Sequence, residues 1–212
     1  MLVVVGGHSR NIGKTSLVEG LIRALPDACW TAVKITQYGH NVCSANGGSC
    51  DCKAGGDHPY ALTEEHQPGL ADSGRFLAAG AKRAFWVRTA VGELGHAIPA
   101  LRKIVADNEN VIFESNSAMQ FFVPDLYVVL LDPAIADMKE STRRYFDRAN
   151  AFVVIDRGAT PFPWEGVPRR WLQGKPRFLA QPPVYAGEEM CAWLRDWSGN
   201  RKAITTKFPS RV

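Results

Sequence analysis

The sequence predicts an α/β fold with three layers, in which a mostly parallel sheet of about six or seven strands carries helices on both faces. Short apolar runs rich in Val, Ile and Phe recur along the 212 residues, and amphipathic helical patterns separate most of them. Strands that alternate with helices in this way form parallel sheets, because each helix crosses over one face of the sheet. The length suits one domain, so residues 1–212 are expected to form a single unit.

The first predicted elements lie on either side of a polar loop. Residues 2–5 (LVVV) are an apolar run that glycine ends, which predicts a buried strand. A helix should begin at Lys14 and end before Pro26, because apolar residues recur there at helical spacing. Residues 29–35 (CWTAVKI) predict the second strand. The polar segment that follows is rich in glycine and too long for an ordinary connection, so an insertion or a mobile functional loop is expected at about 37–70.

The later elements continue the alternation. A short helix is predicted over 71–81, capped by Asp72 or Ser73 and closed by Gly80. The remaining predicted strands are 83–89, 110–114, 126–132, 151–156 and 176–180. The remaining predicted helices lie at about 94–105, at about 136–148 and around 190–197, and the tract 157–176 should be mostly irregular.

The composition indicates a globular protein, with 46% hydrophobic and 22% charged residues. A net charge of +4 suits an anionic small ligand but is too small to indicate nucleic acid. No apolar run could cross a membrane and no signal peptide is recognisable, so a cytoplasmic protein is expected. Three of the five cysteines crowd into one segment, which favours metal or redox chemistry over disulfides. The other two, Cys29 and Cys191, are expected in the core.

The stretch GGHSRNIGKTS (6–16) joins the first strand to the first helix. Phosphate binding requires this setting: a strand, a loop whose backbone N–H groups point inward, and the positive end of a helix. Gly7 and Gly13 would let the backbone approach a phosphate, Lys14 would reach the terminal phosphates, and the Thr15 hydroxyl would hold Mg²⁺. The other predicted nucleotide-binding residues of the loop are Asn11, Ile12 and Ser16.

The loop is one residue longer than the common G-x-x-x-x-G-K-[ST] pattern, because His8 stands where that pattern has its first glycine. Gly7 is expected to supply the turn one residue early, and His8 to act only as a spacer. Arg10 could touch phosphate or could simply be solvated.

This longer loop resembles that of the P-loop NTPases that include the molybdopterin-guanine dinucleotide biosynthesis protein B (MobB) family and, more distantly, dethiobiotin synthetase. The MobB family has a similar strand ending in Lys-His, then a K-D-S…AGA segment. This chain has VKITQYGH and ADSGRFLAAGA, without the histidine after Lys34 and with Ala71 in place of the lysine. The resemblance covers roughly residues 1–156. It implies GTP or ATP binding with Mg²⁺, slow hydrolysis, and an adaptor role beside a partner enzyme of molybdenum cofactor biosynthesis. Apart from the resemblance, a homodimer is one form in which the protein could act.

Charged residues are expected at the same edge of the sheet as the loop. Lys34 ends the second strand and could neutralise a bound anion, or could be an exposed strand-end lysine. Asp72 resembles a metal-binding or water-ordering carboxylate of the MobB family, although a helix cap explains it equally well. Glu114 ends NVIFE, where P-loop proteins hold the Mg²⁺ shell or orient water. We therefore expect Lys14, Asp72 and Glu114 to act in catalysis, and Thr15, Asp72 and Glu114 to hold Mg²⁺.

Two further groups carry weaker predictions. Asp156 ends the strand 151–156 and could accept hydrogen bonds from a guanine edge, or could be an ordinary turn residue. The cluster CSANGGSCDC has the ligand types for tetrahedral Zn²⁺, although a redox pair or free thiols would also explain it. The candidate zinc ligands are Cys43, Cys50, Cys52, His40 and His58.

Two other functions stay open besides the adaptor role. An ATP-dependent small-molecule kinase or ligase could use the same scaffold, with Lys34, Asp72 and Glu114 around an acceptor that the loop 37–70 binds. A metal-binding protein with a vestigial phosphate loop is the third.

Overall fold

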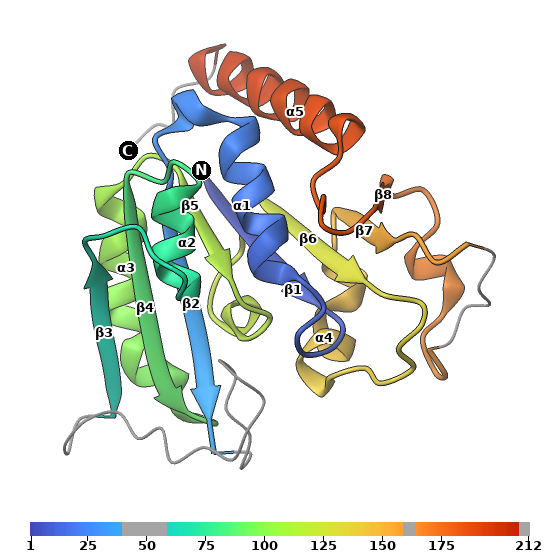
Figure 1. Cartoon of the computed structure of the whole chain (residues 1–212), viewed down its shortest axis with the longest axis horizontal. Coiled ribbons are helices and arrows are strands. Elements are labelled where there is room, and N and C mark those ends of the chain that lie inside the picture. The colour runs from blue at the N-terminus through green and yellow to red at the C-terminus, as the bar shows by residue number, and fades with distance from the viewer. Residues whose placement is uncertain (40–58, 159–163, 208–212) are drawn as a thin grey trace.

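In the computed structural model, eight strands form one sheet (Figure 1), and the residues described are 1–39, 59–158 and 164–207. The strands are β1 (Leu2–Gly7), β2 (Thr31–Tyr38), β3 (Tyr60–Glu65), β4 (Arg83–Ala90), β5 (Val111–Glu114), β6 (Leu126–Leu131), β7 (Ala151–Ile155) and β8 (Arg177–Ala180). The helices are α1 (Lys14–Ala24), α2 (Asp72–Ala78), α3 (Ile98–Asp107), α4 (Glu140–Tyr145) and α5 (Glu188–Lys207). The strand order is β3-β4-β2-β5-β1-β6-β7-β8, and among the strands of these described residues only β3 runs antiparallel to its neighbour. The predicted fold class is confirmed.

The sheet has more strands than predicted because β3 lies inside the segment that was expected to be an insertion or a loop. This edge strand pairs with β4 over six residue pairs, and Glu64 on β3 forms an ion pair with Arg83 on β4, with 2.7 Å between Oε1 and Nε. Its side chains are half-buried or exposed, so its sequence YALTEE has no apolar run of the kind that marks the central strands.

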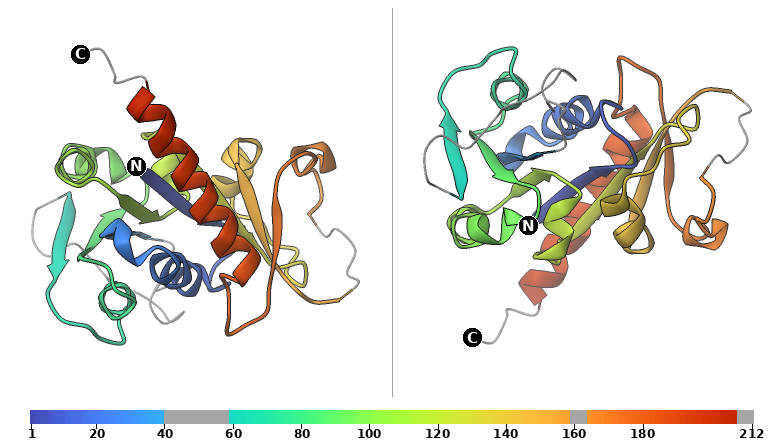
Figure 2. Two further views of the ribbon diagram at one scale, coloured as in Figure 1. Left: turned by 90° about the horizontal axis from the view of Figure 1, so that it is seen from above. Right: turned by 90° about the horizontal axis from the view of Figure 1, so that it is seen from below.

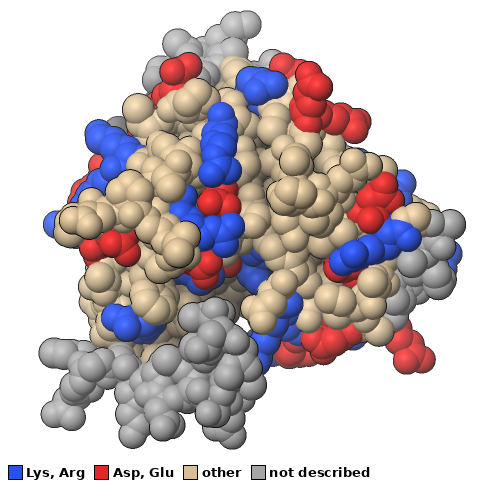
Figure 3. All heavy atoms as spheres, in the orientation of Figure 1, with Lys and Arg blue, Asp and Glu red and all other residues tan. Residues whose placement is uncertain are grey.

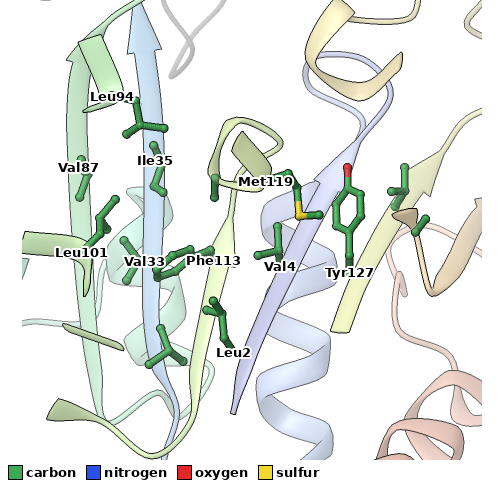
Figure 4. Close-up of a cluster of buried hydrophobic side chains, with 14 of the residues drawn as sticks. Leu2, Val4, Val33, Ile35, Val87, Leu94, Leu101, Phe113, Met119 and Tyr127 are labelled. Atoms are coloured by element: carbon green, nitrogen blue, oxygen red, sulfur yellow. The ribbon is translucent and has the colours of Figure 1, made fainter. Parts of the chain in front are cut away.

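Helices cover both faces of the sheet (Figures 1 and 2). Helices α1, α2 and α5 pack on one face, where Leu17, Phe76 and Met190 share a buried cluster with the side chains of Val3 and Val5. Helices α3 and α4 lie on the other face. Figure 4 shows the second cluster, in which Leu2, Val4, Leu101 and Phe113 are among the buried residues. Successive residues of β1 therefore point to opposite faces, as a strand buried on both sides requires.

Several local predictions were wrong. Ala71, not Asp72 or Ser73, is the N-cap of α2, and no side chain caps this helix, although Gly80 does take a left-handed conformation just after it. The helix predicted over 136–148 is shorter, with only α4 and a 3-10 helix at Phe146–Arg148. Cys29 is exposed and has a φ of 49°, because it forms a turn before β2 rather than part of the strand.

The register of the central strands brings three candidate residues to one edge of the sheet. Glu114 on β5 stands beside Val5 on β1 and beside Lys34 on β2. Since β1, β2 and β5 run parallel, their carboxyl ends open toward the loop that follows β1. Ligands of such sheets bind at this edge.

Candidate functional site

The predicted phosphate loop joins the end of β1 to the start of α1. Two residues of the loop have positive φ: Asn11 at 53° and Gly13, the N-cap of α1, at 99°. The tight turn that was predicted at Gly7 therefore lies at Asn11, and Gly7 is still part of β1. Gly13 has a close neighbour, since a Cβ placed there would lie 2.2 Å from the ring of Tyr185. Strand, loop and helix thus have the arrangement that a phosphate-binding loop requires.

A buried amide fixes the point where the loop leaves the sheet. Asn116 accepts a hydrogen bond from the Gly7 N–H (2.9 Å) and donates to the Gly7 carbonyl (2.8 Å) and to Thr142 Oγ1 (2.7 Å). Thr142 Oγ1 in turn donates to the Gly7 carbonyl at 2.8 Å. Gly6 leaves room for this contact, because a Cβ there would lie 2.2 Å from Asn116 Oδ1. Gly6 therefore makes room for the side chain of Asn116, and Gly7 is held by that side chain within β1. Neither glycine forms a turn.

His8 is a buried structural residue, and its prediction as a spacer was wrong. Its side chain is fully buried; Nδ1 accepts from the Asp132 N–H at 3.3 Å, and Nε2 lies 3.1 Å from the Ile135 carbonyl, to which it donates in the neutral tautomer. The ring packs edge-on against Trp164 with 5.0 Å between centroids. Burial lowers the pKa of His8 below its usual value, and the two carbonyls and the acidic residues nearby oppose that shift. The imidazole therefore links the loop to the segment between β6 and α4.

Three of the predicted residues converge on the ammonium group of Lys34. Its Nζ lies 3.0 Å from Glu114 Oε1, 2.5 Å from Asp72 Oδ2 and 3.4 Å from Thr15 Oγ1. Thr15 donates to the other oxygen of Glu114 at 2.8 Å. Burial acts to lower the pKa of Lys34, but Glu114 and Asp72 outweigh it and the net shift is upward. At the start of α1, therefore, a charged lysine bridges two carboxylates.

Arg75 belongs to this site although it was not among the predicted residues. Its guanidinium donates to Glu19 Oε2 at 2.6 Å and to Ser16 Oγ at 2.9 Å, and it lies 3.7 Å from Asp72. The side chain comes from α2 and crosses to α1. Its position depends on the packing of the two helices, so only the helical spacing from Asp72 could have pointed to it.

These residues line a cavity of about 340 Å³ at the carboxyl edge of the sheet. Its lining comprises Arg10, Asn11, Gly13–Ser16, Lys34–Gln37, Asp72, Arg75, Glu114–Ser117, Lys139 and Ser141. Lys139 was not predicted, because it comes from the segment before α4. On the face seen in Figure 3, acidic and basic side chains are interspersed over the surface.

The other predicted residues lie apart from the cavity or outside the described residues. Gly7 and Ile12 support the loop from β1 and from the core, respectively. Asp156 is exposed at the end of β7, where its carboxylate accepts from the Gly158 N–H at 3.0 Å, so its contact with a base stays a prediction. The candidate zinc ligands Cys43, Cys50, Cys52, His40 and His58 all lie outside the described residues.

Within the described ranges, no group of three or more His, Cys, Asp and Glu side chains could hold a metal ion by itself. Nor does the described part of the chain contain a helix long and apolar enough to cross a membrane.

No protein-family model and no curated protein matches the sequence. One solved structure that the chain resembles is the "apo" form of LpxK from Aquifex aeolicus in complex with ATP, with 18% sequence identity and a TM-score of 0.46. The match covers 84% of this chain and 53% of the LpxK chain, so this chain spans about half the length of that protein. What this chain binds is therefore inferred from its own geometry.

Proposed function

We propose that this protein binds a nucleoside triphosphate, ATP or GTP, together with Mg²⁺ and transfers its terminal phosphoryl group slowly to water. The observation that supports this most is that Lys14 and Thr15, at the start of α1, line one cavity with the buried Glu114. Free N–H groups at a helix start and a lysine ammonium bind phosphate oxygens. A carboxylate beside them can orient the attacking water.

Three oxygen-bearing side chains fit a magnesium ion. Mg²⁺ prefers hydroxyl, carboxylate and water oxygens, and Thr15, Glu114 and Asp72 supply the first two kinds. The Thr15 hydroxyl lies 2.8 Å from Glu114, and Lys34 holds Asp72 and Glu114 toward the same point. When bound, the ion would neutralise charge on the phosphoryl oxygens.

The ion pairs of the cluster support slow hydrolysis. Glu114 and Asp72 both face Lys34, and Asp72 also lies near Arg75. Lys34 and Thr15 contact the two oxygens of Glu114, so few acceptor sites of this carboxylate are free to orient an attacking water. Lys14 would then contribute mainly by binding and orienting the phosphates.

The adaptor role follows from the MobB resemblance of the segments VKITQYGH, ADSGRFLAAGA and VIFE. On this proposal residues 1–212 act as one domain, alone or as a homodimer, beside a partner enzyme of molybdenum cofactor biosynthesis. Slow hydrolysis suits an adaptor, because the partner rather than turnover would set the lifetime of the nucleotide complex.

A second candidate function is an ATP-dependent kinase or ligase that acts on a small molecule. The cavity supports it, because its lining continues beyond the phosphate loop to Thr36 and Gln37 on β2 and to Ser115 and Ser117 after β5. These polar side chains could bind an acceptor next to the terminal phosphate. The phosphoryl group would then pass to the acceptor rather than to water.

Replacing Lys14 tests the nucleotide site. We expect Lys14→Ala to abolish binding of Mg-ATP and Mg-GTP in titration calorimetry and to leave the circular dichroism spectrum unchanged. Lys103→Ala, which removes an exposed lysine on α3, serves as the matched control and should bind like the wild type. Unchanged affinity of Lys14→Ala for both nucleotides would refute the site. Turnover that requires an added acceptor would replace the adaptor role with the kinase or ligase.

A further inference from the structure

Five cationic side chains line the cavity, and they divide into two groups. Lys34 is paired with Asp72 and Glu114, and Arg75 with Glu19. The other three, Arg10, Lys14 and Lys139, form no ion pair with a carboxylate in the part of the chain that the structure describes. One part of the cavity therefore carries positive charge that the protein does not balance.

Lys139 is held beside the phosphate loop by its backbone. Its N–H donates to the carbonyl of His8 at 2.8 Å, and three residues later Thr142 Oγ1 donates to the carbonyl of Gly7 at 2.8 Å. Ser9 adds a third link, with 2.9 Å from its Oγ to Asp137 Oδ2. These hydrogen bonds hold the segment before α4, and the first turn of α4, against residues 7–9 at the start of the loop. The side chain of Lys139 starts from a fixed position and reaches the cavity from there.

The surroundings of Lys139 disfavour its charge when no anion is present. Burial, and after it the neighbouring cations Lys14 and Arg10, together lower the pKa of Lys139 to about 7, against a weaker opposing effect of Glu114 and Asp137. An anion placed between these groups would reverse the effect, because it favours the charged form of each lysine.

We propose that Lys139 binds the terminal phosphate of the nucleoside triphosphate together with Lys14 and Arg10, and that it takes up a proton from solvent as the phosphate binds. This inference rests on the proposed function and adds a binding residue that comes from outside the phosphate loop. No covalent bond changes in the step: one buffer proton is transferred to the Lys139 amine, and the resulting ammonium donates to the phosphate. Nucleotide binding should consequently depend on pH above neutrality.

Proton uptake can be measured by titration calorimetry of Mg-ATP and Mg-GTP at pH 8.0 in two buffers of different ionisation enthalpy. At this pH the phosphates are already ionised, whereas an amine with a pKa of about 7 is about nine-tenths neutral. The wild type should take up close to one proton. Lys139→Gln should bind the triphosphate about tenfold to a hundredfold more weakly, and the diphosphate with a smaller loss.

Lys139→Arg separates charge from protonation, because arginine is charged throughout this range. It should bind the triphosphate more tightly than Lys139→Gln and take up no proton at position 139. Lys103→Gln, on the exposed side of α3, should match the wild type in both affinity and proton uptake. Thermal unfolding of each variant establishes that its fold is intact.

The outcomes separate this inference from the proposed function. Nucleotide binding with the same affinity and the same proton uptake in the wild type and in Lys139→Arg and Lys139→Gln would refute the role of Lys139 and leave the nucleotide site standing. Binding of inorganic tripolyphosphate, but of neither nucleotide, with uptake that Lys139→Arg abolishes would support Lys139 and refute the nucleotide function. Binding of none of these ligands would refute both.

Discussion

The amide of Asn116 provides the most direct test of how the phosphate loop is held. The change Asn116→Ala removes three hydrogen bonds, two to the backbone of Gly7 and one to Thr142. The Gly7 carbonyl keeps a donor, because Thr142 Oγ1 still reaches it at 2.8 Å. The Gly7 N–H loses its side-chain partner in a buried position.

The magnitude follows from this unequal loss. An unsatisfied buried N–H costs about 1–3 kcal/mol, and each hydrogen bond that is lost without leaving an unpaired group costs about 1 kcal/mol. Two bonds of the second kind are lost besides the one that leaves the Gly7 N–H unpaired, so we expect Asn116→Ala to lower the free energy of unfolding by about 3–5 kcal/mol. Asn116→Asp should cost at least as much, because it buries a charged carboxylate against the carbonyl oxygen of Gly7, to which it cannot donate, even though it can still accept from the Gly7 N–H.

The assay is urea unfolding followed by circular dichroism, together with titration of Mg-ATP under native conditions. The control is Gln120→Ala, which removes an exposed amide four residues away and should change the free energy of unfolding by less than about 0.5 kcal/mol. Nucleotide affinity should fall in Asn116→Ala, since the loop loses its support at Gly7. Stability within about 0.5 kcal/mol of the wild type would refute the assigned network.

Two further predictions concern buried groups near β1. Because the pKa of His8 is lower in the folded than in the unfolded chain, its contribution to stability is complete above the unfolded value of about 6.5 and is lost as the pH falls below it. The difference in unfolding free energy between wild type and His8→Gln should therefore shrink from pH 8 to pH 5, and an equal pH dependence of the two proteins would contradict this. The buried hydroxyl of Tyr127 has no hydrogen-bond partner among the described residues. In thermal unfolding, Tyr127→Phe should therefore leave the free energy of unfolding unchanged or raise it by up to about 1 kcal/mol. A loss of more than about 1 kcal/mol would contradict this, because it would mean that the hydroxyl has a partner.

Features with local signals could be predicted from the sequence. The central strands could be predicted from their apolar runs. The Gly-Lys-Thr motif predicts a phosphate loop because a strand precedes it and a helix follows. Lys34 and Glu114 were each expected at the carboxyl edge, and their 3.0 Å contact follows from the parallel register of β2 and β5. Their roles in binding and catalysis stay predictions.

Features that depend on long-range contacts could not be predicted. Arg75 reaches Ser16 only because α2 packs beside α1. Lys139 reaches the cavity because its segment folds back on the loop, where the Lys139 N–H donates to the His8 carbonyl at 2.8 Å. Neither the residue types nor the neighbouring sequence of Arg75 and Lys139 predict these long-range contacts. The edge strand β3 was missed for a different reason: an exposed strand has no buried face, so its sequence shows little alternation.

The unusual length of the phosphate loop has a physical explanation in these contacts. His8 continues the pairing of β1 with β6 through a bond from its N–H to the Leu130 carbonyl, so the loop begins only after it, and Asn11 supplies the turn. The imidazole points away from the cavity and into the β6–α4 segment, where it is buried. A glycine in place of His8 would remove the hydrogen bonds between the imidazole and the segment between β6 and α4. Since the same segment carries Lys139, the histidine that breaks the common pattern also helps to hold beside the loop the lysine that is proposed to bind phosphate.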